Sequence, residues 1–387
     1  MSRLAIIGAN ESIDPLIRKA KDLGYETHVF AWKTGAEGEK NADFFYPVSI
    51  DQKDEILKLC QDIQPEGVCS ITSDFAVRTV NYVARGLGLK CNSEECDLLA
   101  RNKYHMRRAL REHGLPTPWF LRVDHSLSRK EAEELTYPLI VKPTDRWSSK
   151  GVCRVNAPKE LAAAVNRAME ESLEKKAILE EFAEGPEYSC ECISYAGKHR
   201  ALAITKKYTT GYPHYIETGH MQTSDIPPAL WDAVQTAVFR ALDALKIQYG
   251  ASHTEFKLRD NGEIFLIETG ARMGGDCIGT DLVQISTGYD YIRMVIDAAV
   301  GKEPAAYRIN APKTAMVKYI CSREDYEQLR AMLGKYPEYI WRISQIDPIG
   351  TRKVTDSSGR YGYCLFAIDR DDISAVNELT GLMKDMR

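Results

Sequence analysis

Two glutamates are predicted to face each other across a β-hairpin. The hairpin strands, residues 252–258 and 263–268, are joined through a turn that contains Asn261-Gly262. Asn-Gly is the favoured two-residue hairpin turn because both positions accept positive φ angles. With this turn, Glu255 stands directly opposite Glu268 on one face of the sheet, with the two Cβ atoms roughly 5 Å apart. Like charges so placed are destabilising unless a cation lies between them or one carboxylate is protonated.

This carboxylate pair suits a hard, oxygen-seeking cation, because the hairpin offers no histidine or cysteine pair. Mg²⁺ typically binds through one or two carboxylates together with substrate phosphates, and Mn²⁺ is an alternative. The glycine-rich segment 269–275 follows the hairpin at once, and its Arg272 can brace charge that develops on a phosphoryl or acyl oxygen. The alternatives are two solvated glutamates at a sheet edge and an ordinary salt bridge for Arg272.

Two upstream lysines and a polar loop are further candidates for contact with an anion. Lys142 ends an apolar strand, and a buried ammonium there needs an anionic partner. Lys103 lies in a helical segment, where a solvated side chain is the simpler interpretation. The loop 145–151 offers backbone N–H groups and the hydroxyls of Ser148 and Ser149 to a phosphate, although it is not a GxxxxGK[ST] loop.

Composition and charge exclude several classes of protein. The chain has 387 residues with 51 Lys plus Arg, 55 Asp plus Glu and a formal charge of −4, so it lacks the basic excess of proteins that bind DNA mainly through phosphates. No charge-free apolar run approaches the roughly 18 residues of a membrane span, and the first apolar run is too short for a signal peptide. The ten cysteines are too sparse for a disulfide scaffold, which favours a reducing, cytoplasmic location. Cys190 and Cys192 are interpreted as buried thiols.

The first hundred residues alternate strand and helix signals. Helix-length segments separate four apolar strands, predicted at residues 4–7, 26–32, 43–50 and 67–72. This order indicates a parallel α/β sheet. The turn Gly8-Ala9-Asn10 is not a GxGxxG motif and no acidic residue ends the second strand, so a dinucleotide-binding enzyme is not favoured. One long helix is predicted over residues 92–114, and the prolines of segment 114–118 then form a stiff linker.

The remainder of the chain is predicted to combine α/β and α+β structure. Short strands and helices follow the linker, and a longer helix over residues 227–245 precedes the hairpin. After residue 302 the chain turns to short strands and one helix, over residues 323–333. These changes predict domain boundaries after residue 115 and after residue 302.

Residues 252–275, SHTEFKLRDNGEIFLIETGARMGG, resemble the metal-binding end of the ATP-grasp superfamily. Four further segments match the superfamily in order and spacing, at residues 102–107, 137–143, 145–152 and 178–187. The resemblance implies an ATP-grasp fold with four domains. These are an N-terminal parallel α/β domain (1–115), a central lid (116–187), a C-terminal catalytic lobe (188–302) and a small closing domain (303–387). It also implies that the chain binds ATP, that Glu255 and Glu268 hold Mg²⁺ between the ATP phosphates, and that a nearby arginine assists transfer.

The resemblance assigns several basic residues to the ATP phosphates. Lys103 and Lys142 correspond to the lysines that contact phosphate, and the loop 145–151 with its two serines corresponds to the segment that folds over the phosphates. Either Lys206 or Lys207 corresponds to a lysine that reaches the γ-phosphate.

A second set of residues is implied to bind the nucleoside. Glu180 and the backbone around Glu181 and Ala183 correspond to the adenine site, and Glu187 corresponds to the residue at the ribose hydroxyls. Many members carry an asparagine two residues after the second acidic ligand, where this chain has Gly270. Two-carboxylate binding of Mg²⁺ is still expected, and the sequence leaves one or two metal ions open.

The superfamily mostly activates a carboxylate as an acyl phosphate that an amine then attacks. Residues 205–220 resemble a stretch of amino-acid ligases that make dipeptides, in which a glutamate and a histidine three residues later face the substrate amine. Glu217 and His220 have this spacing. The resemblance therefore implies an ATP-dependent carboxylate–amine ligase that acts on small molecules. The charge balance and the short apolar runs indicate that neither a nucleic acid nor a membrane is a partner. The sequence leaves a monomer and a homodimer open.

Two other functions stay open at this point. One is a ligase or carboxylase of the purine-biosynthesis type, for which we expect a cluster of residues that binds the phosphate of the amine substrate. No such cluster is apparent in the sequence. The other is a nucleotide-binding regulator without ligase activity, which the intact Glu255, Glu268 and Arg272 argue against.

Overall fold

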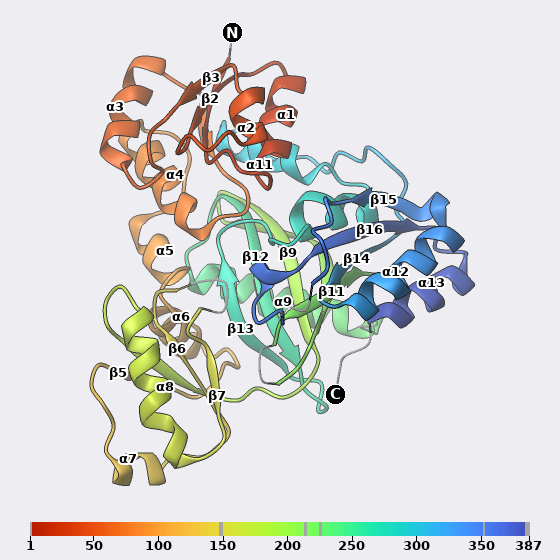
Figure 1. Cartoon of the computed structure of the whole chain (residues 1–387). Coiled ribbons are helices and arrows are strands. Elements are labelled where there is room, and N and C mark those ends of the chain that lie inside the picture. The colour runs from red at the N-terminus through yellow and green to blue at the C-terminus, as the bar shows by residue number, and fades with distance from the viewer. Residues whose placement is uncertain (1, 147–149, 213–214, 224–226, 351–352, 384–387) are drawn as a thin grey trace.

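The computed structural model describes residues 2–146, 150–212, 215–223, 227–350 and 353–383, and these residues form three β-sheets with helices between them (Figure 1). The N-terminal sheet has the strand order β3-β2-β1-β4 and is parallel throughout, as predicted. Its strands are β1 (Arg3–Ile7), β2 (Glu26–Phe30), β3 (Phe44–Tyr46) and β4 (Gly67–Cys69). The helices in this part are α1 (Asp14–Asp22), α2 (Glu37–Asn41), α3 (Lys53–Ile63) and α4 (Asp74–Gly86).

Both faces of the N-terminal sheet are covered, because side chains alternate along its strands. Leu4 and Ile6 of β1 pack with α1 and with the distant helix α11 (Tyr291–Ala299). Ala5 and Ile7 face the other side and pack with α3 and α4. A helix from the later part of the chain therefore completes the N-terminal core (Figure 1).

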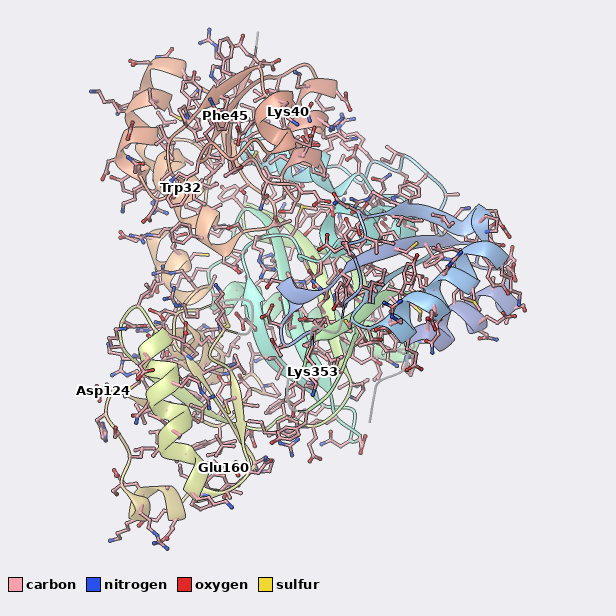
Figure 2. All side chains as sticks on the ribbon, viewed as in Figure 1. Trp32, Lys40, Phe45, Asp124, Glu160 and Lys353 are labelled. Carbon is pink, nitrogen blue, oxygen red and sulfur yellow. The ribbon has the colours of Figure 1, made fainter. Side chains whose placement is uncertain are left out.

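The second sheet is a four-stranded antiparallel sheet in the order β5-β8-β6-β7. Its strands are β5 (Phe120–Val123), β6 (Leu139–Pro143), β7 (Cys153–Val155) and β8 (Ala177–Glu181), and its helices are α7 (Arg129–Glu133) and α8 (Pro158–Glu171). The apolar face of α8 packs on the sheet. Figure 2 shows Asp124 and Glu160 on this unit, far from Trp32 and Phe45 of the N-terminal unit. We call this unit the lid.

The third sheet is antiparallel and has the order β13-β12-β9-β10-β11-β14-β16-β15. Its strands are β9 (Glu187–Tyr195), β10 (Lys198–Thr209), β11 (Glu217–Gln222), β12 (Gly250–Leu258), β13 (Ile264–Gly270), β14 (Thr314–Ile320), β15 (Ile340–Ile343) and β16 (Gly362–Ile368). Because β14 pairs with β11, strands from both sides of residue 303 share one sheet. The four domain bounds given above stay a prediction.

Helices cover one face of this large sheet and leave polar side chains on part of the other. Helices α5 (Glu94–Leu99), α6 (Lys103–Glu112) and α9 (Pro228–Ala244) pack on an apolar layer that includes Cys190, Cys192 and Phe256, which confirms the two cysteines as buried thiols. The remaining helices are α10 (Val283–Thr287), α12 (Arg323–Lys335), α13 (Ile373–Thr380), a π-helical turn (Ile278–Leu282) and three 3₁₀ turns (Pro337–Tyr339, Ser357–Gly359 and Gly381–Met383). In the part of the chain that the structure describes, no helix has the length and apolar character needed to cross a membrane.

The single helix predicted over residues 92–114 is wrong, because the chain forms two helices there. Helix α5 ends at Leu99 and α6 begins at Lys103. The Asn102 side chain accepts hydrogen bonds from the backbone N–H groups of Tyr104 and His105 at 3.1 and 3.2 Å and so starts a new helix. The break matters for function, because it places Lys103 in the first turn of α6.

Candidate functional site

The structure places Glu255 of β12 directly opposite Glu268 of β13, as the sequence predicts. The connecting turn differs from the prediction. The backbone N–H of Arg259 donates to the carbonyl oxygen of Glu263 at 3.0 Å across a three-residue loop, in which Gly262 has a φ of +82°. Ile267 is then an extra residue in β13, a β-bulge that restores the predicted pairing of the two glutamates. The two deviations cancel at the carboxylate pair.

Two lysines neutralise this carboxylate pair. The Lys103 ammonium donates to Glu268 Oε1 at 3.0 Å and to the carbonyl oxygen of Arg146 at 2.7 Å. Lys207 of β10 is paired with Glu255 and lies 3.0 Å from Glu187 Oε1. Burial lowers the pKa of Lys207, but Glu255 and Glu187 outweigh it and hold that pKa well above its usual value.

The pKa values of the carboxylates that pair with these lysines shift in the opposite direction. Burial raises the pKa of Glu187, but Lys207 and Lys257 outweigh it and hold that pKa near 2. Glu255 is likewise held ionised by Lys207 and His253, with a pKa well below its usual value. The Glu187 and Glu255 carboxylates are therefore available as charged oxygen donors. Of the two lysines left open by the sequence, the structure brings Lys207 to the carboxylates.

Behind Glu255 lies a buried histidine–glutamate pair that sequence analysis did not single out. His253 Nδ1 is hydrogen-bonded to the fully buried Glu191, and His253 Nε2 lies 3.3 Å from Glu255 Oε1. Glu191 also accepts the backbone N–H of Gly274 at 2.9 Å. Burial lowers the pKa of His253, but Glu191 and Glu255 outweigh burial and raise that pKa to about 9. The spacing could have indicated His253 from the sequence, because His253 and Glu255 are two residues apart on a strand and therefore share a face.

The raised pKa of His253 makes stability depend on pH in the metal-free protein. A group whose pKa is raised on folding contributes stability in full below its unfolded value of 6.5 and loses it as the pH rises through about 9. We expect the difference in unfolding free energy between the wild type and His253→Gln to be larger at about pH 6 than at about pH 9.5. Urea titrations at both pH values measure it, and an equal difference would contradict the assignment.

Gly274 is predicted to be intolerant of a side chain. A Cβ atom there would lie 2.8 Å from His253 Nδ1 and 3.0 Å from Glu191 Oε1. We expect Gly274→Ala to lower the free energy of unfolding by about 1–3 kcal/mol through overpacking. The matched control is Gly275→Ala, because a Cβ at that position would meet no atom within 4 Å. Equal destabilisation by both substitutions in a urea titration would contradict this reading.

A buried triad of charged side chains joins the lid to helix α6. The Lys142 ammonium lies 2.7 Å from Glu180 Oε2, and Nε of the fully buried Arg107 lies 2.9 Å from Glu180 Oε1. Burial raises the pKa of Glu180, but Arg107 and Lys142 outweigh it and hold that pKa below its usual value. Lys142 in turn has its pKa lowered by burial, although Glu180 raises it. Arg107 was not predicted, although it lies four residues after Lys103 and so on the same helix face.

The other predicted nucleotide-site residues occupy the edge of the lid. Glu181 Oε1 accepts the backbone N–H of Trp119 at 3.0 Å, and the backbone N–H of Phe182 donates to the carbonyl oxygen of Pro138 at 3.2 Å. Ala183 is buried. Ser148 and Ser149 lie outside the described residues.

Arg272 is held by an aspartate from the N-terminal unit. Its Nε and Nη2 atoms donate to the two carboxylate oxygens of Asp74, each at 3.0 Å. Asp74 is the first residue of α4, five residues after β4, and was not predicted. Its position in the sequence could have indicated it, since side chains at the carboxyl ends of parallel strands commonly line ligand sites.

Glu217 and His220 lie on the same face of β11. Thr218 is an extra residue in the pairing with β10, so the two side chains are only two pairing positions apart, and His220 pairs with Lys207. The hydroxyl of Ser357 donates to Glu217 Oε2 at 2.5 Å. His220 is 1% exposed, and its Nδ1 atom has no hydrogen-bond partner among the described residues.

Asp276 and Arg360 complete this part of the site and were missed by sequence analysis. Asp276 Oδ2 lies 3.8 Å from His220 Nε2, and Arg360 donates to both oxygens of Asp276 at 2.8 and 2.9 Å. Burial raises the pKa of Asp276, but His220 and Arg360 outweigh it and hold that pKa well below its usual range. Asp276 and Cys277 both have positive φ angles, of 53° and 64°. Such strained backbone clusters at functional sites.

The polar face of the large sheet thus combines an opposed carboxylate pair, two ammonium groups, a guanidinium and a buried histidine. Opposed carboxylates suit a divalent cation, and the cations around them suit polyphosphate. No group of three or more histidine, cysteine or acidic side chains arranged for a metal ion occurs in the described parts of the chain. The Glu255–Glu268 pair stays the predicted metal-binding pair, and Gly270 contributes no side chain to it.

Comparisons with known proteins agree with this geometry. A family profile for the ATP-grasp domain matches residues 135–281. The alanine–anticapsin ligase of Bacillus subtilis is 28% identical over 336 residues, which are 77% of this chain and 69% of that protein. The D-alanine–D-alanine ligase of Ralstonia pickettii is 30% identical over 190 residues, which are 46% of this chain and 55% of that protein.

Solved structures reproduce the fold over nearly the whole chain. An L-amino acid ligase from Bacillus licheniformis superposes with a TM-score of 0.81 and 23% identity, covering 99% of this chain and 98% of that one. A phosphoribosylglycinamide synthetase from Anaerococcus prevotii has a TM-score of 0.75 and 21% identity, with 99% and 98% covered. At these identities the likeness bears on the fold alone, and it confirms the fold class predicted from the sequence.

Proposed function

We propose that this chain, which belongs to the ATP-grasp superfamily and is an ATP-dependent ligase that forms C–N bonds, joins the carboxylate of one amino acid to the amine of another. The observation that carries the proposal is the Glu255–Glu268 pair with Lys103, Lys207 and Arg272 around it. Phosphoryl transfer requires positioning and charge neutralisation rather than covalent help from the protein, and this set of side chains supplies both.

Glu255 and Glu268 are the proposed ligands of Mg²⁺, or of Mn²⁺ in its place. The donor set fits such an ion, because it consists of two carboxylates opposite each other on one sheet face, and the pKa of Glu255 is held well below its usual value by Lys207 and His253. When bound, the ion supplies charge neutralisation for the phosphates of ATP. Lys103 and Lys207, now paired with these carboxylates, are the proposed phosphate contacts on the large sheet.

Lys142 is the proposed phosphate contact on the lid, and Ser148 and Ser149 of the adjoining loop are proposed to join it. Glu180, Glu181 and Ala183 are proposed to hold the adenine and Glu187 the ribose. The Glu180 carboxylate is already bound by Arg107 and Lys142.

The reaction proposed for these residues has two steps. A carboxylate oxygen of the first substrate attacks the γ-phosphorus, the bond from that phosphorus to the bridging oxygen breaks, and ADP leaves with that oxygen. The amine of the second substrate then attacks the acyl carbon, phosphate leaves, and the amine loses a proton. Arg272 braces the negative charge on the transferred group and on the acyl oxygen in these steps.

Glu217 and His220 are proposed to hold the attacking amine. The Glu217 side chain binds the ammonium form, and the unpartnered Nδ1 atom of His220 is placed to accept a proton. Asp276 lies beside the other ring nitrogen and stabilises the imidazolium that results. Support for an amino-acid substrate also comes from the relatives, whose names specify alanine.

A phosphate-release screen tests the proposal. Purified protein receives MgATP and pairs of the twenty amino acids, with Glu268→Gln as the inactive control. The expected result is phosphate release with particular pairs and none with the variant. Silence with all pairs, together with ATP binding by calorimetry, would contradict an amino-acid ligase and leave another carboxylate or amine, a purine-type reaction or a regulator as the outcome.

A further inference from the structure

The guanidinium of Arg272 is held in a single orientation by groups on either side of it. Asp74 accepts from Nε and Nη2 in a two-point contact, each bond 3.0 Å long. Nη1 donates to the carbonyl oxygen of Met273 at 3.2 Å. A guanidinium has five N–H donors in a fixed plane, so one donor on Nη1 and one on Nη2 stay uncommitted. Asp74 occupies the Nε–Nη2 edge, which leaves these donors on Nη1 and Nη2 for an oxyanion, and Asp74 determines where they point.

We propose that Asp74 is a positioning residue for Arg272, so that the rate of ligation depends on a carboxylate supplied by the N-terminal sheet unit; this rests on the proposed function of Arg272. Asp74 begins α4, and the preceding Ser73 caps that helix by accepting the backbone N–H of Ala76 at 3.2 Å. The carboxylate is thus attached to a rigid helix end and not to a loop. No other partner of the Asp74 side chain occurs among the described residues besides Arg272.

Gly270 makes room for this pair. A Cβ atom on Gly270 would lie 3.0 Å from Asp74 Oδ1 and 3.2 Å from Arg272 Cζ. Both distances are tighter than ordinary van der Waals contact, so any side chain at 270 displaces the carboxylate, the guanidinium or both. The backbone of Gly270 has no positive φ angle, so the conformation itself accepts alanine. The geometry of the Asp74–Arg272 ion pair therefore depends on the absence of a side chain at position 270.

The consequence is a rate effect without an effect on ATP affinity. Among the described residues, the Asp74 side chain pairs with Arg272 and forms no hydrogen bond or ion pair with a residue proposed to bind ATP. A misplaced catalytic group costs roughly 10- to 100-fold in rate even when it is still present. Asp74→Asn keeps the shape of the side chain but offers only one acceptor oxygen. We expect it to lower kcat by about 10- to 100-fold and to leave KM for ATP within about twofold.

A double-mutant cycle separates positioning from a purely structural role. The variants are Asp74→Asn, Arg272→Lys, Gly270→Ala and the pairwise combinations, assayed by phosphate release with MgATP and the amino-acid pair that gives the highest rate in the screen. Arg272→Lys alone is expected to lose about 10²- to 10³-fold in kcat. Because Asp74 acts through Arg272, adding Asp74→Asn to it should cost less than about a further twofold. Gly270→Ala should likewise lower kcat and add little to Asp74→Asn.

Lys19→Gln is the matched control. Lys19 of α1 lies 2.9 Å from Asp290 at the start of α11, an ion pair of similar exposure that also joins the N-terminal unit to the later part of the chain. It should leave kcat within about twofold. Multiplicative losses for Asp74→Asn and Arg272→Lys, or an equal loss in Lys19→Gln, would overturn the positioning role.

Two results separate failure of this inference from failure of the proposed function. If Arg272→Lys retains full activity, or if no amino-acid pair releases phosphate, the proposed function fails. The position of Arg272 is then still tested by crystal structures of the wild type and Asp74→Asn with MgADP. A guanidinium that has moved from its wild-type place in the variant supports the inference, and an unmoved one overturns it.

Discussion

Glu268→Gln is expected to lower the rate of phosphate release by about 10³-fold, the largest kinetic effect among our predictions. The substitution preserves size and removes one of two charged oxygen donors opposite each other on the sheet. It also leaves the Lys103 ammonium without its acidic partner, 3.0 Å away in the wild type. Metal-assisted stabilisation of a transferring phosphoryl group is worth several kcal/mol, and about 4 kcal/mol corresponds to about 10³-fold in rate. The loss should appear in kcat, measured at saturating ATP.

Glu263→Gln is the control for this prediction. Glu263 lies on the same hairpin and also forms an ion pair, with Arg259 at 3.0 Å, but at the turn end. Its neutralisation should leave the rate within about twofold, because exposed ion pairs contribute little. Calorimetric titration with Mg²⁺ in the presence of ATP gives a second readout, which should weaken for Glu268→Gln and stay unchanged for the control. Full activity of Glu268→Gln would remove the glutamate pair from the mechanism.

The carboxylate pair illustrates what hairpin patterns in a sequence can and cannot specify. The prediction that Glu255 faces Glu268 is confirmed, yet the turn has three residues and β13 contains a bulge at Ile267. The bulge depends on tertiary contacts. The backbone N–H of Leu266 donates to the carbonyl oxygen of Pro116 at 2.9 Å, and the Thr117 hydroxyl donates to the carbonyl oxygen of Leu266 at 3.1 Å. These contacts join segments about 150 residues apart, as the separation of 149 between Thr117 and Leu266 shows, and no local pattern encodes them.

The same limit applies to the partners of the predicted basic residues. Lys142 and Arg272 could be selected because their local surroundings, an apolar strand end and a glycine-rich segment, predict an exceptional environment. The partner of Arg272 and the second cation at Glu180 could not, since Asp74 is 198 residues from Arg272 and Arg107 is 73 residues from Glu180. An aspartate at a helix start and an arginine in a helix are ordinary features of a sequence. Only the packing of the lid and the N-terminal unit on the large sheet brings them to the site.

Helix prediction failed at Asn102 for a local reason. The apolar periodicity continues through residues 92–114, so the pattern favours one helix. The Asn102 side chain competes for the backbone N–H groups of the next turn, and it also donates to Glu174 of the lid. A capping residue within a periodic stretch was thus the available signal for the break that places Lys103 beside Glu268.

Arg107→Met is expected to lower the free energy of unfolding by about 3 kcal/mol, the largest stability effect among our predictions. Arg107 is fully buried, and it holds Glu180 Oε1 and Oε2 at 2.9 and 3.2 Å. Without it, the buried Glu180 has only the Lys142 ammonium, 2.7 Å from Oε2. Removing one partner of a buried ion pair costs about 3–5 kcal/mol, because the remaining charge is left partly uncompensated. Urea unfolding measures the loss.

The variant should also become less sensitive to acid. A carboxyl group whose pKa is lowered on folding contributes stability that is present above its unfolded value of 4.5 and is lost as the pH falls through its folded pKa. In Arg107→Met only one cation opposes the burial of Glu180, so the folded pKa rises toward or beyond the unfolded value, and this loss in acid shrinks or reverses. The unfolding midpoint in urea, measured from about pH 7 to pH 4, should therefore fall less steeply for the variant than for the wild type.

Arg108→Met separates this effect from the general cost of losing an arginine in α6. Arg108 is the next residue, is exposed, and pairs with Glu112 on the helix surface at 3.2 Å, so its loss should cost less than about 0.5 kcal/mol. Equal destabilisation by the two substitutions would show that Arg107 acts through helix stability alone. A large effect confined to Arg107→Met, with a raised KM for ATP, would instead tie the buried charge of Glu180 to the seating of the lid. Lys142 would then depend on α6, the helix that also carries Lys103, for its position.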